Sequence, residues 1–373
     1  MIRATFCAFG LAALAVSLLW SLDSQTDRRG ERSRTRPATL SALDVASASV
    51  RNGPIYMVTE DSRTERFCLD CRERFRARQG RLAAPFRRFS APLRHLRGFK
   101  PGVPPLISPD GQHVLYAVLS SPADASAWQF APWDLIASNV DWKHQQLVGE
   151  PQTLLKAVRY PELLDYAWSP DSRSIAILTD SNRRPALSIV DLAGTPIRRL
   201  PTGCARTLGT VPVAPIESPL LTWSRTNSIA FVAGYRRTEN TAIYTVSAEG
   251  SEPCRLMFSR PRAAQDFGPA WSPGGRRLAF VRWGVNRTDA LMTVVRSRGR
   301  PRRLRLRSPN DKSPRSLAWS PDGRWMAFLP ESTNGIWIVR AGGGRVRVVS
   351  VPTKIARDES VRRLNWAPAT PDG

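Results

Sequence analysis

One short phrase recurs along the chain: a large apolar residue, most often Trp, followed by Ser-Pro-Asp-Gly or a variant of it. The clearest copy is Trp-Ser-Pro-Asp-Gly at residues 319–323. Five further copies, several of them imperfect, begin at Ile107, Trp168, Trp223, Trp271 and Trp366. The steps between successive copies are 61, 55, 48, 48 and 47 residues, and a regular period of this length is typical of repeat architectures.

The phrase predicts a tight turn. Pro fixes φ at the first corner, Asp accepts hydrogen bonds from nearby backbone amides, and Gly tolerates positive φ. We therefore expect a structural role for the phrase, with its Trp residues packed in the core. The residues predicted to form these repeat turns are Ser108, Asp110, Trp168, Asp171, Trp223, Trp271, Trp319, Asp322 and Trp366.

Alternating apolar runs follow each turn and predict β-strands. After the turn at 319–323 they lie at 326–329, 336–339 and 346–349, and the three preceding repeats carry equivalent runs. With the short strand that carries the Trp, each repeat supplies four strands. Four antiparallel strands every 40 to 50 residues form the blade of a β-propeller, so the fold class is predicted to be all-β.

At these residues the chain resembles a known family. Trp-Ser-Pro-Asp-Gly, an arginine and Met-Ala-Phe at 319–328 look like the repeat of TolB-like propellers, which also occurs in prolyl-oligopeptidase-type enzymes. The resemblance covers residues 53–373 and implies a TolB-like, WD40-like propeller. TolB proteins of the Tol–Pal system carry an N-terminal α/β domain, for which the sequence before residue 53 is too short. The hydrolase domain of the enzymes has no room in this chain either.

The two ends of the repeat region complement each other. Residues 53–58 match 335–339, so they are predicted to form the third strand of a blade, whereas residues 361–366 match a first strand and then the pattern stops. A composite closing blade would remove the open sheet edges that favour aggregation. Five internal blades and one composite blade predict six blades.

The N-terminal segment has the composition of a membrane-directed sequence. Residues 4–22 are uncharged and mostly apolar, which fits an uncleaved signal anchor or a cleaved signal peptide, assigned together to residues 1–22. Residues 23–40 are predicted to be a polar linker, and residues 41–373 the propeller. The arginines after the apolar segment favour a cytoplasmic propeller. Large domains are nevertheless translocated largely regardless of charge, and we expect a membrane-anchored or secreted protein with an extracytoplasmic propeller.

The chain is strongly basic, with a formal net charge of +24, but its 55 basic residues are almost all Arg. Biased coding explains such an excess as well as an anionic partner does, so nucleic-acid binding has no support beyond charge. The densest stretch is an Arg-rich insertion at residues 62–100. It is either a solvated surface or a docking element for a polyanion.

Motifs for catalysis are absent from the sequence. His95, His113 and His144 are scattered along the chain, and there is no His-Glu-x-x-His or Gly-x-Ser-x-Gly motif. Cys68 and Cys71 form a C-x-x-C pair, which is open to a local disulfide, free thiols or a metal. Outside the cell, these two together with Cys204 and Cys254 allow three pairings of two bridges. We predict no catalytic residues, no cofactor-binding residues and no metal site.

These observations favour a monomeric, non-enzymatic cell-envelope propeller that binds a protein or peptide as a scaffold module. The membrane would be reached through residues 4–22. Two alternatives remain open: a hydrolase- or lyase-type propeller enzyme with a site at the channel mouth, and a polyanion-binding protein that uses the Arg-rich insertion.

Overall fold

The computed structural model describes residues 52–59, 64–67, 105–120, 132–141, 146–159, 163–181, 184–205, 219–234, 240–258, 264–283, 290–295, 299–307, 314–330, 335–350 and 361–368. The chain divides into two units, Met1–Arg36 and Pro37–Gly373, and all described residues belong to the second. The regular secondary structure of the described residues is entirely β-strand.

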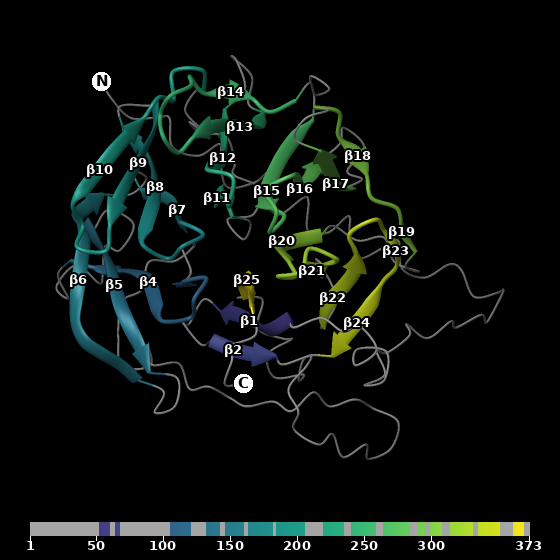
Figure 1. Ribbon diagram of the computed structural model, residues 1–373, viewed down its shortest axis with the longest axis horizontal. Helices are drawn as coiled ribbons and strands as arrows, with labels where there is room; N and C mark the ends of the chain where they lie inside the picture. The colour runs from purple at the N-terminus through teal and green to yellow at the C-terminus, as the bar shows by residue number, and fades with distance from the viewer. Residues whose placement is uncertain are drawn as a thin grey trace, which may run out of the picture. The chain divides into compact units, whose positions relative to one another are not determined.

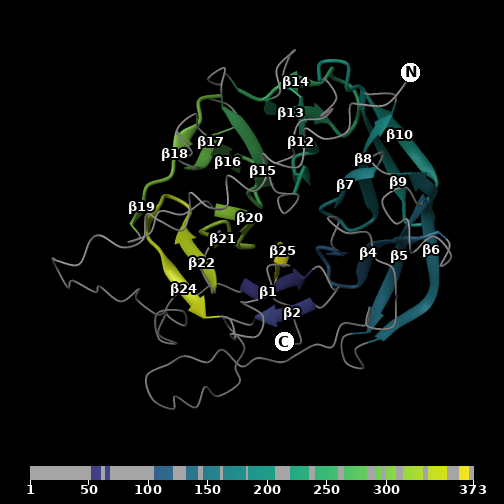
Figure 2. The ribbon, with the colours of Figure 1, turned by 180° about the vertical axis from the view of Figure 1, so that it is seen from behind.

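Five four-stranded antiparallel sheets, blades 1 to 5, surround a common centre within this unit (Figures 1 and 2). Blade 1 contains β3 (Leu106–Ile107), β4 (His113–Leu119), β5 (Pro132–Asp141) and β6 (Gln146–Arg159). Blade 2 contains β7 (Leu163–Trp168), β8 (Ser174–Ser181), β9 (Arg184–Asp191) and β10 (Pro196–Leu200). Blade 3 contains β11 (Leu221–Trp223), β12 (Ser228–Gly234), β13 (Thr241–Ser247) and β14 (Arg255–Leu256).

Blade 4 contains β15 (Gln265–Trp271), β16 (Arg277–Trp283), β17 (Ala290–Val295) and β18 (Arg302–Arg303). Blade 5 contains β20 (Pro314–Trp319), β21 (Trp325–Pro330), β22 (Gly335–Arg340) and β24 (Arg347–Ser350). A short parallel pair, β19 (Leu306–Arg307) and β23 (Gly344–Arg345), joins the end of blade 4 to the edge of blade 5. The closing sheet contains β1 (Asn52–Thr59), β2 (Thr64–Phe67) and β25 (Val361–Pro368).

The strands predicted from the alternating apolar runs are confirmed. Each run overlaps a second, third or fourth strand of its blade, and the Trp of each phrase in blades 2 to 5 ends the first strand. The second strands supply the deepest core, because their apolar side chains point into both faces of the blade. Phe231, Phe280 and Phe328 occupy equivalent places in three of them and are fully buried.

The predicted number of six four-stranded blades is wrong. The described residues form five, and the sheet in which the two ends of the repeat region meet has three strands in the order β2-β1-β25. The segment 53–58 was predicted to be a third strand, but β1 pairs directly with β25 and therefore takes the second place. The sequence after β2 is arginine-rich and has no further alternating apolar run comparable with 336–339.

The predicted pairing of the chain's ends is confirmed by the register of this sheet. Ile55 lies opposite Trp366 and Val58 opposite Arg363, in an antiparallel arrangement. The backbone amide of Leu364 also donates to Ser316 Oγ at 2.7 Å, which ties β25 to the first strand of blade 5. Residues 64–67 lie inside the predicted Arg-rich insertion 62–100 but form β2, and the rest of that insertion lies outside the described residues.

A disulfide joins two neighbouring blades at their outer edges. Cys204 follows β10 of blade 2 and Cys254 precedes β14 of blade 3, and their Cα atoms are 5.6 Å apart. The sequence left this pairing open among three. Cross-linking residues 50 positions apart stabilises a fold by about 4 kcal/mol through the entropy of the unfolded chain. Cys68 and Cys71, the C-x-x-C pair left open between a local disulfide, free thiols and a metal, lie outside the described residues.

Removal of β25 tests the closure. Deleting residues 361–373 takes away the only described inner strand of the closing sheet, together with the buried Leu364 and Trp366. We expect a large fall in melting temperature or aggregation, because the edges of β1 and blade 5 become exposed. Deleting only residues 369–373 is the matched control and should melt like the full chain. Equal melting of the two truncated proteins would contradict the closure.

Candidate functional site

A cavity of about 490 Å³ lies where the first strands of the blades converge. Its walls come from every blade and from β25, and they are formed mainly by the repeated turn phrase. Seven of the nine predicted turn residues line it, and Ser108 and Asp322 do not. Those seven are Asp110, Trp168, Asp171, Trp223, Trp271, Trp319 and Trp366. The sequence predicted the turns but not that they would surround a common space.

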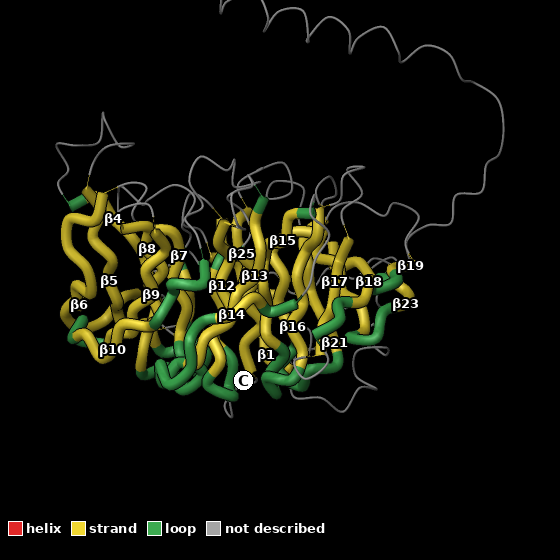
Figure 3. Tube along the Cα trace, turned by 90° about the horizontal axis from the view of Figure 1, so that it is seen from above, coloured by secondary structure: helices red, strands yellow, loops and turns green. Residues whose placement is uncertain are grey.

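The turns gather at one side of the strands, as Figure 3 shows. In the turn at 320–324, Ser320 Oγ donates to Asp322 Oδ1 and accepts from the backbone amide of Trp325 at 2.9 Å. Gly323 adopts φ of +69° and its amide donates to Ser320 O. Ser108, Ser169 and Ser224 repeat this arrangement and are buried. The serine is thus the hydrogen-bonding centre of the phrase, a role that the sequence analysis gave to Asp.

The carboxylates at the cavity are held by their own turns. Asp110 Oδ1 accepts from Ser108 Oγ and from the amide of Gln112, and Asp171 Oδ1 accepts from Ser169 Oγ and the amide of Arg173. The hydrogen bond from Ser169 lowers the pKa of Asp171, and the amide and charge of Arg173 act in the same direction, against an opposing effect of burial. Asp171 therefore remains ionised at neutral pH.

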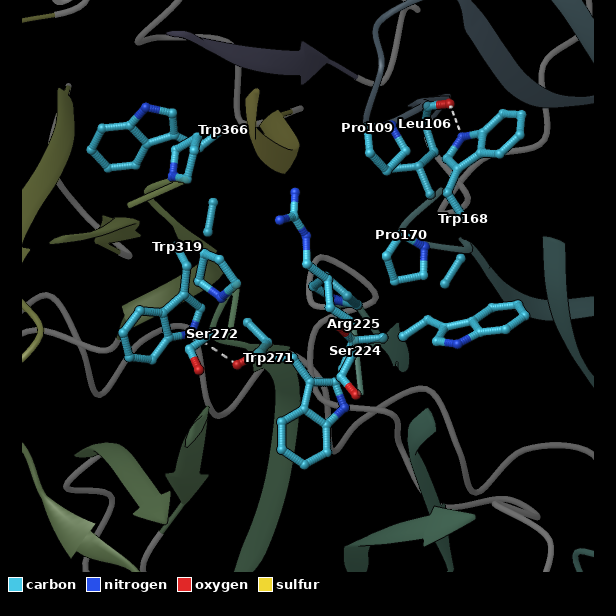
Figure 4. A pocket seen from close by; sticks show the side chains of 18 of the residues that line it. Leu106, Pro109, Trp168, Pro170, Ser224, Arg225, Trp271, Ser272, Trp319 and Trp366 are labelled. Atoms are coloured by element: carbon cyan, nitrogen blue, oxygen red, sulfur yellow. Dashed lines mark hydrogen bonds between the residues drawn. The ribbon is translucent and has the colours of Figure 1, made fainter. Parts of the chain in front are cut away.

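The tryptophans of the phrase link neighbouring blades. Trp168 Nε1 donates to Leu106 O of blade 1 at 3.0 Å, and Trp319 Nε1 donates to Ala270 O of blade 4 at 2.9 Å (Figure 4). The Nε1 atoms of Trp223 and Trp271 are buried and have no hydrogen-bond partner in the described part of the chain. The two boundaries of blade 3 therefore depend on other bonds.

Those bonds come from buried polar side chains near the boundaries. At the boundary of blades 2 and 3, the buried Asp165 accepts through Oδ2 from the amides of Leu220 and Leu221 at 2.7 and 3.0 Å. At the boundary of blades 3 and 4, the buried Thr241 donates from Oγ1 to Asp266 O at 3.0 Å. The Cys204–Cys254 disulfide adds a covalent link across the first of these two boundaries.

One cation reaches into the cavity. Arg225 stands where the other turns around the cavity carry Pro, and its exposed side chain extends into the middle of the space. Figure 4 shows it between Trp319 and Trp366 on one side and Pro109 and Pro170 on the other. No described residue forms a hydrogen bond or ion pair with its guanidinium group. Sequence reasoning missed this residue, although an Arg in place of the Pro of the phrase was a visible signal.

The remaining candidate residues are scattered. His113 Nδ1 lies 2.7 Å from Asn139 Oδ1 in blade 1 and does not line the cavity, and His95 and His144 lie outside the described residues. Within the described ranges, no three His, Cys, Asp or Glu side chains are placed to hold a metal ion. Among those same residues, no helix is long and apolar enough to cross a membrane. The predicted signal anchor or signal peptide, residues 1–22, lies outside them.

Known proteins resemble this chain in structure. No protein-family model matches it, and no curated protein matches its sequence. TolB from Acinetobacter baumannii superposes with a TM-score of 0.55 at 14% identity, over 85% of this chain and 67% of TolB. A chain of a nidogen–laminin complex superposes with a TM-score of 0.52 at 12% identity, over 85% of this chain and 99% of that one. The fold is therefore a TolB-like β-propeller.

The two Trp environments give a matched test. Trp319 and Trp271 occupy equivalent positions and are equally buried, but only Trp319 Nε1 has a partner. Replacement by Phe keeps most of the packing. We expect Trp319→Phe to lower the free energy of unfolding by about 1 kcal/mol more than Trp271→Phe, because only the former leaves a carbonyl without its donor. Equal losses in urea unfolding would contradict the bond.

The lowered pKa of Asp171 predicts a pH dependence. A carboxyl whose pKa is lower in the folded state stabilises the fold above its unfolded pKa, about 4, and this contribution is lost as pH falls through the folded value. Asp171→Asn keeps an acceptor for Ser169 but removes the charge. The stability difference between parent and variant should therefore shrink toward zero in acid, as measured by urea unfolding at several pH values. A difference that is constant with pH would show that the charge is irrelevant.

Proposed function

We propose that this TolB-like propeller is a non-enzymatic module that binds a segment of a protein partner in its central cavity. The observation that carries the proposal is the composition of the cavity wall, in which Trp and Pro side chains surround Arg225, whose guanidinium group has no partner among the described residues. Aromatic and proline surfaces favour an extended peptide, and the guanidinium of Arg225 supplies a polar contact that fixes its position.

The size of the cavity agrees with such a ligand. Its volume of about 490 Å³ lies in the range of pockets that enclose small molecules or a few residues of a peptide. The carboxylates of Asp110 and Asp171 already accept hydrogen bonds within their own turns. Arg225 is therefore the charged group most available to a ligand, and we expect the bound segment to present a carboxylate to it.

We further propose that the propeller is extracytoplasmic. A disulfide between blades 2 and 3 persists in oxidising compartments, and it agrees with the apolar segment 4–22 predicted to direct or anchor the chain. The monomeric state and the membrane attachment stay predictions.

Site-specific photocrosslinking tests the binding site. A photoreactive amino acid replaces Thr222, which lines the cavity, or Glu249, which lies exposed in a hairpin of blade 3, in the full chain expressed in its host cells. We expect position 222 to crosslink one protein at one segment, identified by mass spectrometry, and position 249 not to crosslink it. Equal crosslinking from both positions, or none from 222, would refute the proposal.

The crosslinked segment, made as a peptide, then measures the role of Arg225. Arg225→Pro restores the residue found at this place in the neighbouring turns, so the fold should be retained. Affinity should fall about tenfold or more, the loss expected for a hydrogen bond to a charged group. Arg276→Gln removes an exposed arginine from the turn of blade 4 and is the charge-matched control. If both variants bind like the parent, Arg225 has no part in recognition.

A further inference from the structure

The positive charge of the described residues is concentrated in one place. Residues 299–307 and 335–350, here called the arginine arc, contain eight Arg and no Asp or Glu. All other described residues together contain sixteen Lys or Arg and thirteen Asp or Glu. An excess of Arg spread evenly by coding bias would not leave the other described residues nearly neutral. The arc is therefore a feature of its own.

Strand pairing brings the two halves of the arc together. β19 lies parallel to β23, with Arg307 opposite Arg345, and the amide of Gly344 donates to Arg305 O at 2.9 Å. The segment that leaves blade 4 thus runs along the outer edge of blade 5. In Figure 1, β18, β19, β23 and β24 follow one another along the outside of the ring. Six of the eight arginines are exposed.

An aromatic side chain fixes part of this surface. The guanidinium groups of Arg340 and Arg347 lie 5.4 and 5.3 Å from the ring centre of Trp325, within the range of cation–π contacts. Two like charges are therefore held close together at a surface position.

The shape of the surface selects the class of ligand. The arc lies on the outer edge of the ring and contributes no residue to the central cavity. Single-stranded nucleic acid is usually bound in a groove with exposed stacking aromatics. None of the large apolar side chains that are exposed in the described residues, Val148, Ile197 and Trp283, belongs to the arc. An outward-facing, purely electrostatic surface fits a broad anionic plane.

We propose that the arginine arc docks the propeller on a membrane surface rich in anionic phospholipids. Each Lys or Arg near such a surface contributes about 1 kcal/mol to the free energy of membrane binding. A few arginines acting together are therefore sufficient for peripheral binding. A chain tethered by an apolar segment, as predicted for residues 4–22, would need less binding energy from the arc, because the tether raises the concentration of the propeller at the membrane. The proposal does not depend on the peptide site in the cavity, and anionic lipid on either side of a membrane would serve.

Energy transfer from Trp to lipid tests the docking with the full chain. The protein is added to vesicles that contain dansyl-labelled lipid in phosphatidylcholine, either alone or with about 30% phosphatidylglycerol as the anionic component. This readout reports the approach of the propeller even when the apolar segment inserts into both kinds of vesicle. We expect more energy transfer with the anionic vesicles than with the neutral ones. This difference should disappear in about 1 M salt, because the Debye length there is about 3 Å.

Two charge-matched variants locate the effect. The first replaces the exposed Arg300, Arg302, Arg305 and Arg345 by Gln, and the second replaces four exposed arginines elsewhere, Arg199, Arg255, Arg276 and Arg277. Both lose four charges, and both should melt like the parent.

The arc variant should give the same transfer with anionic and neutral vesicles, whereas the second variant should keep the parent's difference. If both variants lost this difference in energy transfer equally, vesicle binding would depend on the overall charge of the protein and not on the arc. No difference in the parent, or arc-dependent binding of single-stranded DNA without vesicle docking, would also overturn the proposal.

Discussion

The pairing of β1 with β25 is the contact on which the ring depends. Each of blades 1 to 5 is formed from consecutive hairpins, so it needs only local strand pairing. The closing sheet instead joins residues about 300 positions apart. Bringing these ends together costs loop-closure entropy that no local contact repays. Until it forms, β1 and the first strand of blade 5 lack their neighbours, and the cavity lacks the wall that Leu364 and Trp366 supply.

The boundaries between blades use different bonds for the same purpose. Two use a Trp indole that donates to the carbonyl of the preceding blade, one uses the Asp165 carboxylate, and one uses the Thr241 hydroxyl. A buried N–H without a partner costs about 1–3 kcal/mol, and the two boundaries of blade 3 carry that cost at Trp223 and Trp271. Asp165 and the disulfide lie at the first of its boundaries, and Thr241 at the second. The Trp ring of the phrase is thus kept at each of these boundaries, whereas the hydrogen bond that links the blades differs from one boundary to the next.

The sequence predicted what depends on local pattern and missed what depends on ring geometry. Alternation located the strands, and Pro, Asp and Gly located the turns, because both features are encoded within a few residues. The resemblance of residues 53–58 to a third strand was misleading, since an apolar strand pattern states which residues alternate but not which neighbour they pair with. Arg225 and the cavity were missed for a related reason: five turns and β25 converge on one space only after the ring has formed.

Charge in this chain has to be judged by position. Its net value of +24 predicts attraction to any polyanion, and coding bias alone would account for it. In the structure, the arginine side chains lie in two different environments, which the net charge does not distinguish. One arginine points into the central cavity, where its guanidinium group would pair with a single carboxylate of a ligand. Eight others lie together on an outer edge, where each bond is weak and only their number gives affinity. The first arrangement favours recognition of one partner, and the second favours adhesion to an extended surface, so a propeller that uses both would hold its partner beside a membrane.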